Sequence, residues 1–278
     1  MLFLLDTYYI MLLTLYIEIG VKLRILTIGD VVSKQGCDYL RQTLPKLKRE
    51  FNADIVIVNG ENSAVGNGIL PQSADHIFDS GADVITLGNH SLKRPEICNY
   101  LDENEYIIRP ANYHPSAAGH GMVIVDKGYT NLAVINLQGA IFLDAIRNPF
   151  DIIDDLIDEA KEKGAKNIIV DFHAEATAEK RAMGFYLDGK ISAIFGTHTH
   201  VQTSDNQILP NGTGYITDIG MTGPLQSVLG VSPECAIEKM RTGLPVRFKN
   251  DDGVCTVEGC LFELDNNGKT VYTEIFRR

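Results

Sequence analysis

The stretch Gly196-Thr197-His198-Thr199-His200 directly follows the apolar run Ile191–Phe195. An apolar run of this length predicts a buried strand, and the polar residues after it predict a loop at the end of that strand. If the loop is extended, His198 and His200 point to the same side of the chain, as metal-binding histidines do. The stretch therefore predicts a strand of an α/β sheet that delivers two imidazoles to a site beyond its carboxyl end.

Four other polar clusters occupy the same kind of position, each at the end of a strand-like apolar run. They are Gly29-Asp30, Gly60-Glu61-Asn62, Gly88-Asn89-His90 and Asp171-Phe172-His173. Taken alone, each cluster also has a purely structural explanation. Asp30 would cap a turn, for example, and His173 would be a buried histidine whose hydrogen bonds are all made inside the protein. Because ligands gather at the carboxyl ends of the strands in open α/β sheets, we expect all five clusters to share one site.

The donor atoms of these clusters indicate two metal ions. Carboxylates, amides and imidazoles in this number exceed the needs of one tetrahedral ion and suit two ions of five or six coordination. The mixture favours Fe, Mn or Zn over Ca or Mg. Asp171, inside its strand, is interpreted as a buried hydrogen-bonding residue and not as a ligand.

The composition of the chain argues against binding to long nucleic acids and indicates a reducing compartment. The chain has 278 residues and a formal net charge of −11, from 25 Lys and Arg against 36 Asp and Glu. An acidic protein does not displace counterions from a long nucleic acid, although metal ions can still attract a small anion. The five cysteines are odd in number and none forms a Cys-x-x-Cys motif. We therefore expect a cytoplasmic protein with free thiols.

The first 22 residues are interpreted as an extension outside the fold, compatible with a mis-assigned start codon. They are apolar, but Asp6 and Glu18 interrupt the run and no basic residue precedes it. A signal peptide needs a positive start, and a membrane-spanning helix needs about 20 nearly uncharged residues. We expect no membrane partner and a single domain over residues 23–278.

Strands and helices alternate through the first two thirds of this domain, and strands dominate the last third. The expected helices are Cys37–Phe51, Pro71–Ser80, Pro95–Asn104, Asp151–Lys163 and Thr177–Leu187. The expected strands are Arg24–Ile28, Asp54–Val58, Asp83–Leu87, Met122–Val125, Asn131–Leu137, Asn167–Phe172, Ile191–Phe195, Gly214–Thr217, Leu244–Lys249, Val254–Leu264 and Thr270–Ile275. This order predicts an α/β fold with either one mixed sheet or two packed sheets, with helices outside.

The clusters named above, taken together, resemble the YmdB-like bacterial metallophosphoesterases. The resemblance extends through Arg109-Pro110-Ala111-Asn112, Leu209-Pro210-Asn211-Gly212-Thr213, Asp218-Ile219-Gly220-Met221-Thr222-Gly223-Pro224 and Thr242-Gly243-Leu244-Pro245-Val246-Arg247-Phe248. It covers residues 23 to 250 and implies a calcineurin-like metallophosphoesterase sandwich, in which two packed mixed β-sheets are flanked by helices.

The resemblance also implies a two-metal site, with divalent or mixed-valence ions. By motif position, one ion is held by Asp30, Glu61, Asn62 and His200, and the other by Glu61, Asn89, His173 and His198. Glu61 is then the bridge, and His90 is the catalytic imidazole. The wider superfamily opens with Asp-x-His, whereas this chain has Val32 two residues after Asp30, so Glu61 and Asn62 must fill that place.

The function implied by the resemblance is hydrolysis of small cyclic nucleotides, with 2′,3′-cyclic ones favoured. A metal-activated hydroxide would attack the phosphorus, and His90 would protonate the leaving oxygen. We expect the loops around Asn112, Phe142 and Leu225 to select the substrate. A homo-oligomer is compatible with an enzyme of this size.

Three other functions are alternatives to this one. A phosphomonoesterase of the same fold, acting on nucleotides or phosphoproteins, shares the core motifs and stays open. An amidohydrolase is disfavoured, because its His-x-His normally follows the first strand of a barrel and here Asp30 comes first. A non-catalytic metal-dependent regulator would lack a ligand or the acid, and the sequence lacks neither.

Overall fold

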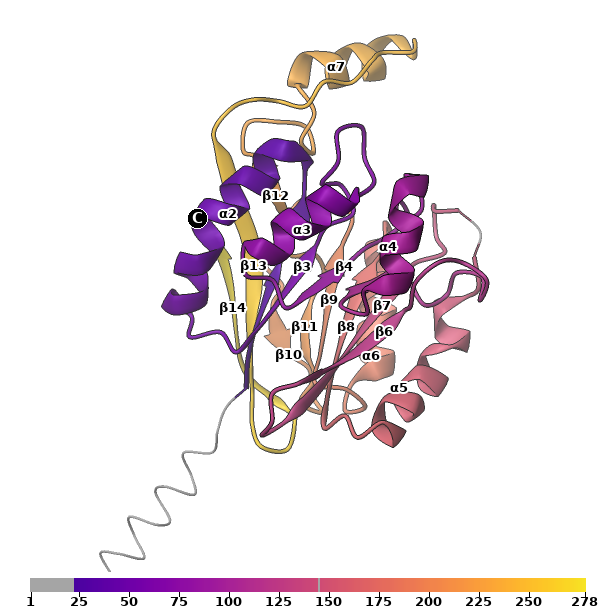
Figure 1. Ribbon diagram of the computed structural model, residues 1–278, viewed down its shortest axis with the longest axis vertical. Coiled ribbons are helices and arrows are strands. Elements are labelled where there is room, and N and C mark those ends of the chain that lie inside the picture. Colours follow the sequence, from indigo (N-terminus) through magenta and orange to yellow (C-terminus); the bar gives the residue numbers. More distant parts are fainter. Residues whose placement is uncertain (1–22, 145) are drawn as a thin grey trace, which may run out of the picture.

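The computed structural model describes residues 23–144 and 146–278, and these form two β-sheets that pack face to face with helices on the outside (Figure 1). The interpretation of residues 1–22 as an extension lies outside the described residues. The expected division at residue 23 stays a prediction, although the first strand does begin at Leu23.

The first sheet has eight strands. They are β1 (Leu23–Ile28), β2 (Asp30–Val31), β3 (Ile55–Asn59), β4 (Val84–Thr86), β5 (Ile107–Ile108), β12 (Met221–Pro224), β13 (Cys255–Leu264) and β14 (Thr270–Arg277). Their order is β2-β12-β13-β1-β3-β4-β5, with β14 beside β13. Because β1, β3 and β4 are parallel neighbours, their carboxyl ends lie at the same edge of the sheet.

The second sheet has six strands. They are β6 (Met122–Asp126), β7 (Asn131–Gln138), β8 (Asn167–His173), β9 (Ala193–Thr197), β10 (Gln207–Ile208) and β11 (Gly214–Ile216). Their order is β10-β11-β9-β8-β7-β6. Here β7, β8 and β9 run parallel, so a second set of carboxyl ends is gathered at one edge.

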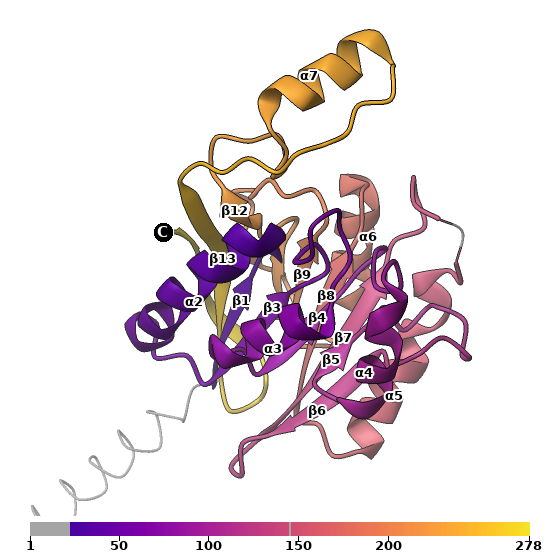
Figure 2. The ribbon, with the colours of Figure 1, turned by 45° about the horizontal axis from the view of Figure 1, so that its top comes forward.

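Helices cover the outer face of each sheet. The first sheet is covered by α2 (Ser33–Glu50), α3 (Pro71–Asp79) and the 3₁₀ turn η1 (Pro95–Ile97) continued by α4 (Cys98–Glu103). The second is covered by the 3₁₀ turn η2 (Pro149–Asp151), α5 (Ile153–Glu162) and α6 (Thr177–Leu187). The remaining helix, α7 (Pro233–Thr242), projects away from both sheets (Figure 2).

The fold has four layers: helices, the first sheet, the second sheet and helices. The alternation of side chains along the central strands explains this arrangement. In β1, Leu26 and Ile28 pack under α2, whereas Ile25 points into the core between the sheets. In β8, Val170 packs under the helices of the second sheet and Ile169 points into the same inter-sheet core. A strand that is buried on both faces needs a continuous apolar run, which is the pattern seen in the sequence.

The predicted fold class, two packed mixed sheets flanked by helices, is confirmed. Most predicted elements occur within a few residues of their expected bounds. The strand expected over Leu244–Lys249 is wrong, because this segment is irregular and follows α7, which the sequence reading missed. Pro245 has no amide hydrogen, and no neighbouring strand edge pairs with the segment in the described chain. Among the described residues, no helix combines the length and apolar character that crossing a membrane requires.

Candidate metal centre

Five segments, at the carboxyl ends of strands of both sheets, bring eight polar residues to one place. Asp30 follows β1, Glu61 and Asn62 follow β3, and Asn89 and His90 follow β4 in the first sheet. His173 ends β8, while His198 and His200 follow β9 in the second. We call seven of these residues the metal cluster: Asp30, Glu61, Asn62, Asn89, His173, His198 and His200. His90 lies beside the cluster.

One half of the metal cluster consists of Asp30, Asn62 and His200. His200 Nε2 lies 3.5 Å from Asp30 Oδ1 and 3.2 Å from Asn62 Nδ2. Asn62 faces the cluster with its amide nitrogen, and a half-turn of the amide would present the oxygen that a cation needs. These three residues match the set that the motif positions assign to one ion.

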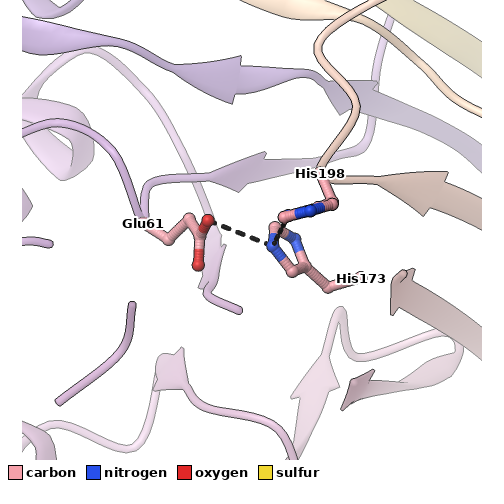
Figure 3. Close-up of side chains that lie close together, drawn as sticks. All are labelled: Glu61, His173 and His198. Atoms are coloured by element: carbon pink, nitrogen blue, oxygen red, sulfur yellow. Dashed lines mark hydrogen bonds and ion pairs between the residues drawn. The ribbon is translucent and has the colours of Figure 1, made fainter. Parts of the chain in front are cut away.

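The other half consists of Asn89, His173 and His198. His173 Nε2 lies 3.0 Å from Asn89 Oδ1. The same nitrogen lies 3.1 Å from His198 Nδ1 (Figure 3). Potential ligand atoms of Glu61, His173 and His198 all lie within 4.8 Å of one another. Three donors this close together on side chains from three different segments are typical of a metal site.

Glu61 contacts both halves of the cluster. Its Oε1 lies 3.0 Å from His173 Nε2 and accepts a hydrogen bond from Asn62 Nδ2 at 3.1 Å. The side chain is fully buried, and so is that of Asp30. A carboxylate with contacts on both sides has an oxygen to offer to each half of the cluster.

The residues fit a pair of cations. Two carboxylates are buried side by side, which costs free energy unless positive charge compensates them. Asp30 Oδ1 is buried and accepts no hydrogen bond from any described residue. Imidazole nitrogens and carboxylate oxygens also face one another across short distances, as they do around an Fe, Mn or Zn ion.

In the protein alone, His173 supplies part of that positive charge. Burial opposes its protonation, but the carboxylates of Glu61 and Asp30 raise its pKa to about 9. Burial also works against the charge of Glu61, yet the imidazoles of His173 and His90 hold the pKa of that carboxyl well below its usual range. Burial and the charge of His173 lower the pKa of His198 to about 4. The His198 imidazole is therefore neutral at pH 7 and able to accept a cation.

A chain of hydrogen bonds orients His173 from behind. Its Nδ1 lies 2.8 Å from Thr197 Oγ1, which donates to Asp171 Oδ1 at 2.7 Å. Asp171 Oδ2 accepts from Thr86 Oγ1 and from Asn59 Nδ2. Asp171 therefore lies behind the cluster, where the sequence interpretation put it. Such a contact fixes the ring and turns Nε2 toward the cluster.

The loop after β9 is not extended. His198 has a φ of 96° and His200 a φ of 62°, both in the left-handed region. The extended loop on which the expected common direction of the two rings depended is therefore not formed. His198 contacts the half of the cluster around His173, and His200 contacts the half around Asp30. The strained backbone divides the two imidazoles between the halves.

A buried ion pair that the sequence reading missed holds this loop in place. Lys180 Nζ lies 2.7 Å from Asp218 Oδ2 and donates to Thr197 O at 2.7 Å. The same carboxylate accepts from the backbone amide and the hydroxyl of Thr199. Lys180 lies on the buried stripe of α6 with Met183 and Leu187. A lysine on an apolar helix stripe was the signal that could have revealed it.

A second missed contact orients His200. Its Nδ1 lies 3.2 Å from the carbonyl oxygen of Leu229, whose φ is 55°. A hydrogen bond between them leaves Nε2 directed at Asp30 and Asn62. No side-chain pattern marks such a backbone contact in the sequence.

Gly88 lets the loop after β4 approach the cluster. A Cβ atom at this position would lie 2.2 Å from His173 Cδ2 and 2.4 Å from Glu61 Oε2. Any side chain here would displace two of the central residues. The next residues, Asn89 and His90, are thereby placed against the cluster.

His90 lies between the cluster and a cavity. Its backbone amide donates to Glu61 Oε2 at 3.0 Å. Its Nδ1 lies 3.3 Å from Glu61 Oε1 and 3.2 Å from Asn62 Oδ1. Within residues 23–144 and 146–278 the ring makes no hydrogen bond through Nε2, and the residue lines the cavity.

The cavity has a volume of about 950 Å³, and Glu61, Asn62, His198 and His200 lie on its wall. Segments 32–35, 65–67, 229–231 and 247–250 also line it, together with Lys93 and Glu175. The loops around Asn112, Phe142 and Leu225 were expected to select the substrate, but these three residues do not lie on the cavity wall. Asn112 is buried and bonds the carbonyls of Gln138 and Arg147 instead.

Comparison with known proteins finds relatives that match nearly the whole chain. A family model described as "YmdB-like protein" matches residues 26–276. A 2′,3′-cyclic-nucleotide 2′-phosphodiesterase of Bacillus subtilis is 46% identical over 247 residues, which are 89% of this chain and 93% of that protein.

Two solved structures have the same fold over nearly their whole length. A hypothetical protein from Thermus thermophilus superposes with a TM-score of 0.86 at 36% identity, covering 92% of this chain and 99% of that one. A protein of Mycoplasma pneumoniae described as a novel phosphatase superposes with a TM-score of 0.87 at 33% identity, covering 94% of both chains.

Proposed function

The chain belongs to the YmdB-like protein family, and on that basis we propose that it is a metal-dependent phosphodiesterase that hydrolyses small cyclic nucleotides. The 2′,3′-cyclic compounds are the favoured substrates, because the Bacillus subtilis relative is named for them. The observation that carries the proposal is the position of Glu61, which contacts both halves of the metal cluster.

In this proposal Asp30, Asn62 and His200 would hold one cation, and Asn89, His173 and His198 would hold the other. Glu61 would contribute to both. Two such cations, when bound, supply Lewis-acid charge to the phosphate and lower the pKa of water. Iron or manganese is favoured, and zinc is compatible with the same donors.

His90 is proposed as the general acid. A ribose oxygen is a poor leaving group, and protonating it typically contributes about 10²–10⁴-fold to the rate. Glu61 and Asn62 engage Nδ1 of His90. Nε2 is then the atom that gives its proton to the leaving oxygen in the cavity.

A phosphomonoesterase activity on nucleotides or phosphoproteins is the second candidate. The Mycoplasma pneumoniae structure that is described as a novel phosphatase favours it. The metal cluster serves either reaction, because both need positive charge around a phosphorus atom. A non-catalytic metal-dependent regulator is the least favoured reading.

The test is an assay of the Mn²⁺- or Fe²⁺-loaded protein with three substrates: 2′,3′-cyclic AMP, 3′,5′-cyclic AMP and p-nitrophenyl phosphate. We expect the highest kcat/KM with the 2′,3′-cyclic nucleotide and loss of activity after chelation. Preference for p-nitrophenyl phosphate would establish the phosphomonoesterase instead. No turnover of any substrate would contradict both.

The proposal also covers the cellular location and the oligomeric state of the enzyme. A cytoplasmic location is supported by the cysteines, since Cys37, Cys98, Cys235, Cys255 and Cys260 are all free thiols. Thiols of this kind persist in a reducing compartment. A homo-oligomer is compatible with the exposed apolar side chains Ile237 and Met240 of α7.

A further inference from the structure

The cavity beside the metal cluster is rich in basic side chains, although the chain has a formal net charge of −11. Its basic lining residues are Lys34, Lys93, Arg247 and Lys249. Its acidic ones are Glu61, which belongs to the metal cluster, and Glu175, whose Oε2 lies 2.9 Å from His198 Nε2. Positive charge that is gathered at one cavity of an acidic protein draws an anion there.

Three of these basic residues are free to bind a ligand. The ammonium group of Lys34 is already paired, 2.5 Å from Asp38 Oδ2. In contrast, the side chains of Lys93, Arg247 and Lys249 are exposed and form no ion pair with any other described residue. We call these three residues the basic rim.

Backbone hydrogen bonds tie the basic rim to the metal cluster. The carbonyl of Lys249 accepts from the amide of Ser232 at 2.9 Å, and the amide of Asp251 donates to the carbonyl of Gly230 at 3.1 Å. The neighbouring carbonyl of Leu229 lies 3.2 Å from Nδ1 of His200. One short turn therefore positions both a ligand of the cluster and the segment that carries Arg247 and Lys249.

Apolar side chains line the same cavity. Val65, Leu229 and Phe248 all lie on its wall, and Phe248 is 53% exposed. An exposed aromatic ring is a surface on which a nucleobase stacks. With a volume of about 950 Å³, the cavity is also near the upper end of the range for small-ligand pockets, about 300–1,000 Å³.

We propose that the basic rim binds a second phosphate of the substrate. The inference rests on the proposed function, because there the cations meet the charge of the scissile phosphate and leave Lys93, Arg247 and Lys249 for another anionic group. The preferred substrate is then a cyclic nucleotide with a further phosphate, either on its own 5′ carbon or as the link in a short oligonucleotide.

The test is calorimetric binding of reaction products to the Mn²⁺-loaded protein. The probes are adenosine 3′-phosphate, adenosine 3′,5′-bisphosphate and a diadenosine dinucleotide with a 3′-phosphate. We expect one or both probes with a second phosphate to bind about tenfold more tightly than adenosine 3′-phosphate, as two or three exposed charge contacts would give. The advantage should shrink as salt is added, because these contacts are screened.

The variant is the double substitution Arg247→Gln with Lys249→Gln, and its matched control is Lys239→Gln with Arg241→Gln on α7. The control residues are basic, exposed and outside the cavity wall. We expect the first pair to reduce the advantage of the second phosphate toward one, and the control pair to preserve it. A preference for the bisphosphate alone identifies the 5′-phosphate, and a preference for the dinucleotide alone identifies the internucleotide link.

Equal binding of all three probes to the unaltered protein would overturn the inference. So would an Arg247→Gln, Lys249→Gln protein that keeps the full advantage of the second phosphate over adenosine 3′-phosphate. Binding is measured without turnover. Failure to hydrolyse any cyclic nucleotide would therefore count against the proposed function. The binding result for the basic rim could still be interpreted.

Discussion

The metal cluster and the basic rim meet at one cavity, but the structure holds them in different ways. Asp30, Glu61 and His173 are fully buried, and contacts from both sheets fix them. Arg247 and Lys249 are exposed, and hydrogen bonds to their backbone carbonyls from Cys235 and Ser232 hold this part of the chain. The comparison teaches that reaction chemistry needs a rigid support, while recognition of a flexible charged group can use mobile side chains.

Removing Glu61 tests the rigid half of this comparison most severely. We expect Glu61→Ala to lose at least one of two bound ions, because this carboxylate contacts both halves of the cluster. Turnover should then fall to the level of the ion-free protein. Elemental analysis of the purified variant checks this, with Glu238→Ala on α7 as a control that is exposed and lies outside the cluster and the cavity wall. If the Glu61→Ala protein still bound two ions per chain, Glu61 would not be a ligand that both ions need.

Removing His90 separates proton transfer from metal binding. We expect His90→Ala to retain both ions while its kcat falls about 10²–10⁴-fold, the usual contribution of a general acid. Metal content and turnover are both measured on one preparation of the variant and compared with those of the unaltered protein. Loss of metal in proportion to loss of activity would instead make His90 a ligand.

Thr197 and Thr86 offer a matched pair behind the cluster. Both hydroxyls donate to Asp171, but only that of Thr197 also contacts His173. We expect Thr197→Val to weaken metal binding about 10–100-fold, as loss of a contact behind a metal ligand typically does. Thr86→Val should weaken it less. Equal effects, measured by metal titration, would show that Thr197 does not act through the imidazole.

The pH dependence of metal uptake follows from His173. Its pKa of about 9 in the protein alone means that the imidazole is protonated at pH 7, and a cation must displace that proton. The apparent affinity should therefore rise about tenfold per pH unit from pH 7 and level off above about pH 9. Calorimetry in buffers of different ionisation enthalpy measures the released proton. Uptake without proton release at pH 7 would contradict this protonation state.

The metal cluster was accessible to sequence reasoning and the basic rim was not. Each residue of the cluster follows an apolar run, and parallel strands bring their carboxyl ends together, so Asp30 and His173 could be assigned to one site. Arg247 and Lys249 lie in Leu244–Lys249, whose composition suggested a strand. Their true setting depends on α7 and on backbone bonds to residues 229–232, which side-chain patterns do not encode. The same applies to the contact between His200 and the Leu229 carbonyl.

The most direct test of the account is the anomalous diffraction of a crystal of the Mn²⁺-loaded protein. We predict two peaks, one among Asp30, Asn62 and His200 and one among Asn89, His173 and His198, with Glu61 touching both. A single peak, or two peaks that do not share Glu61, would contradict the central claim that both sheets together build a two-cation site.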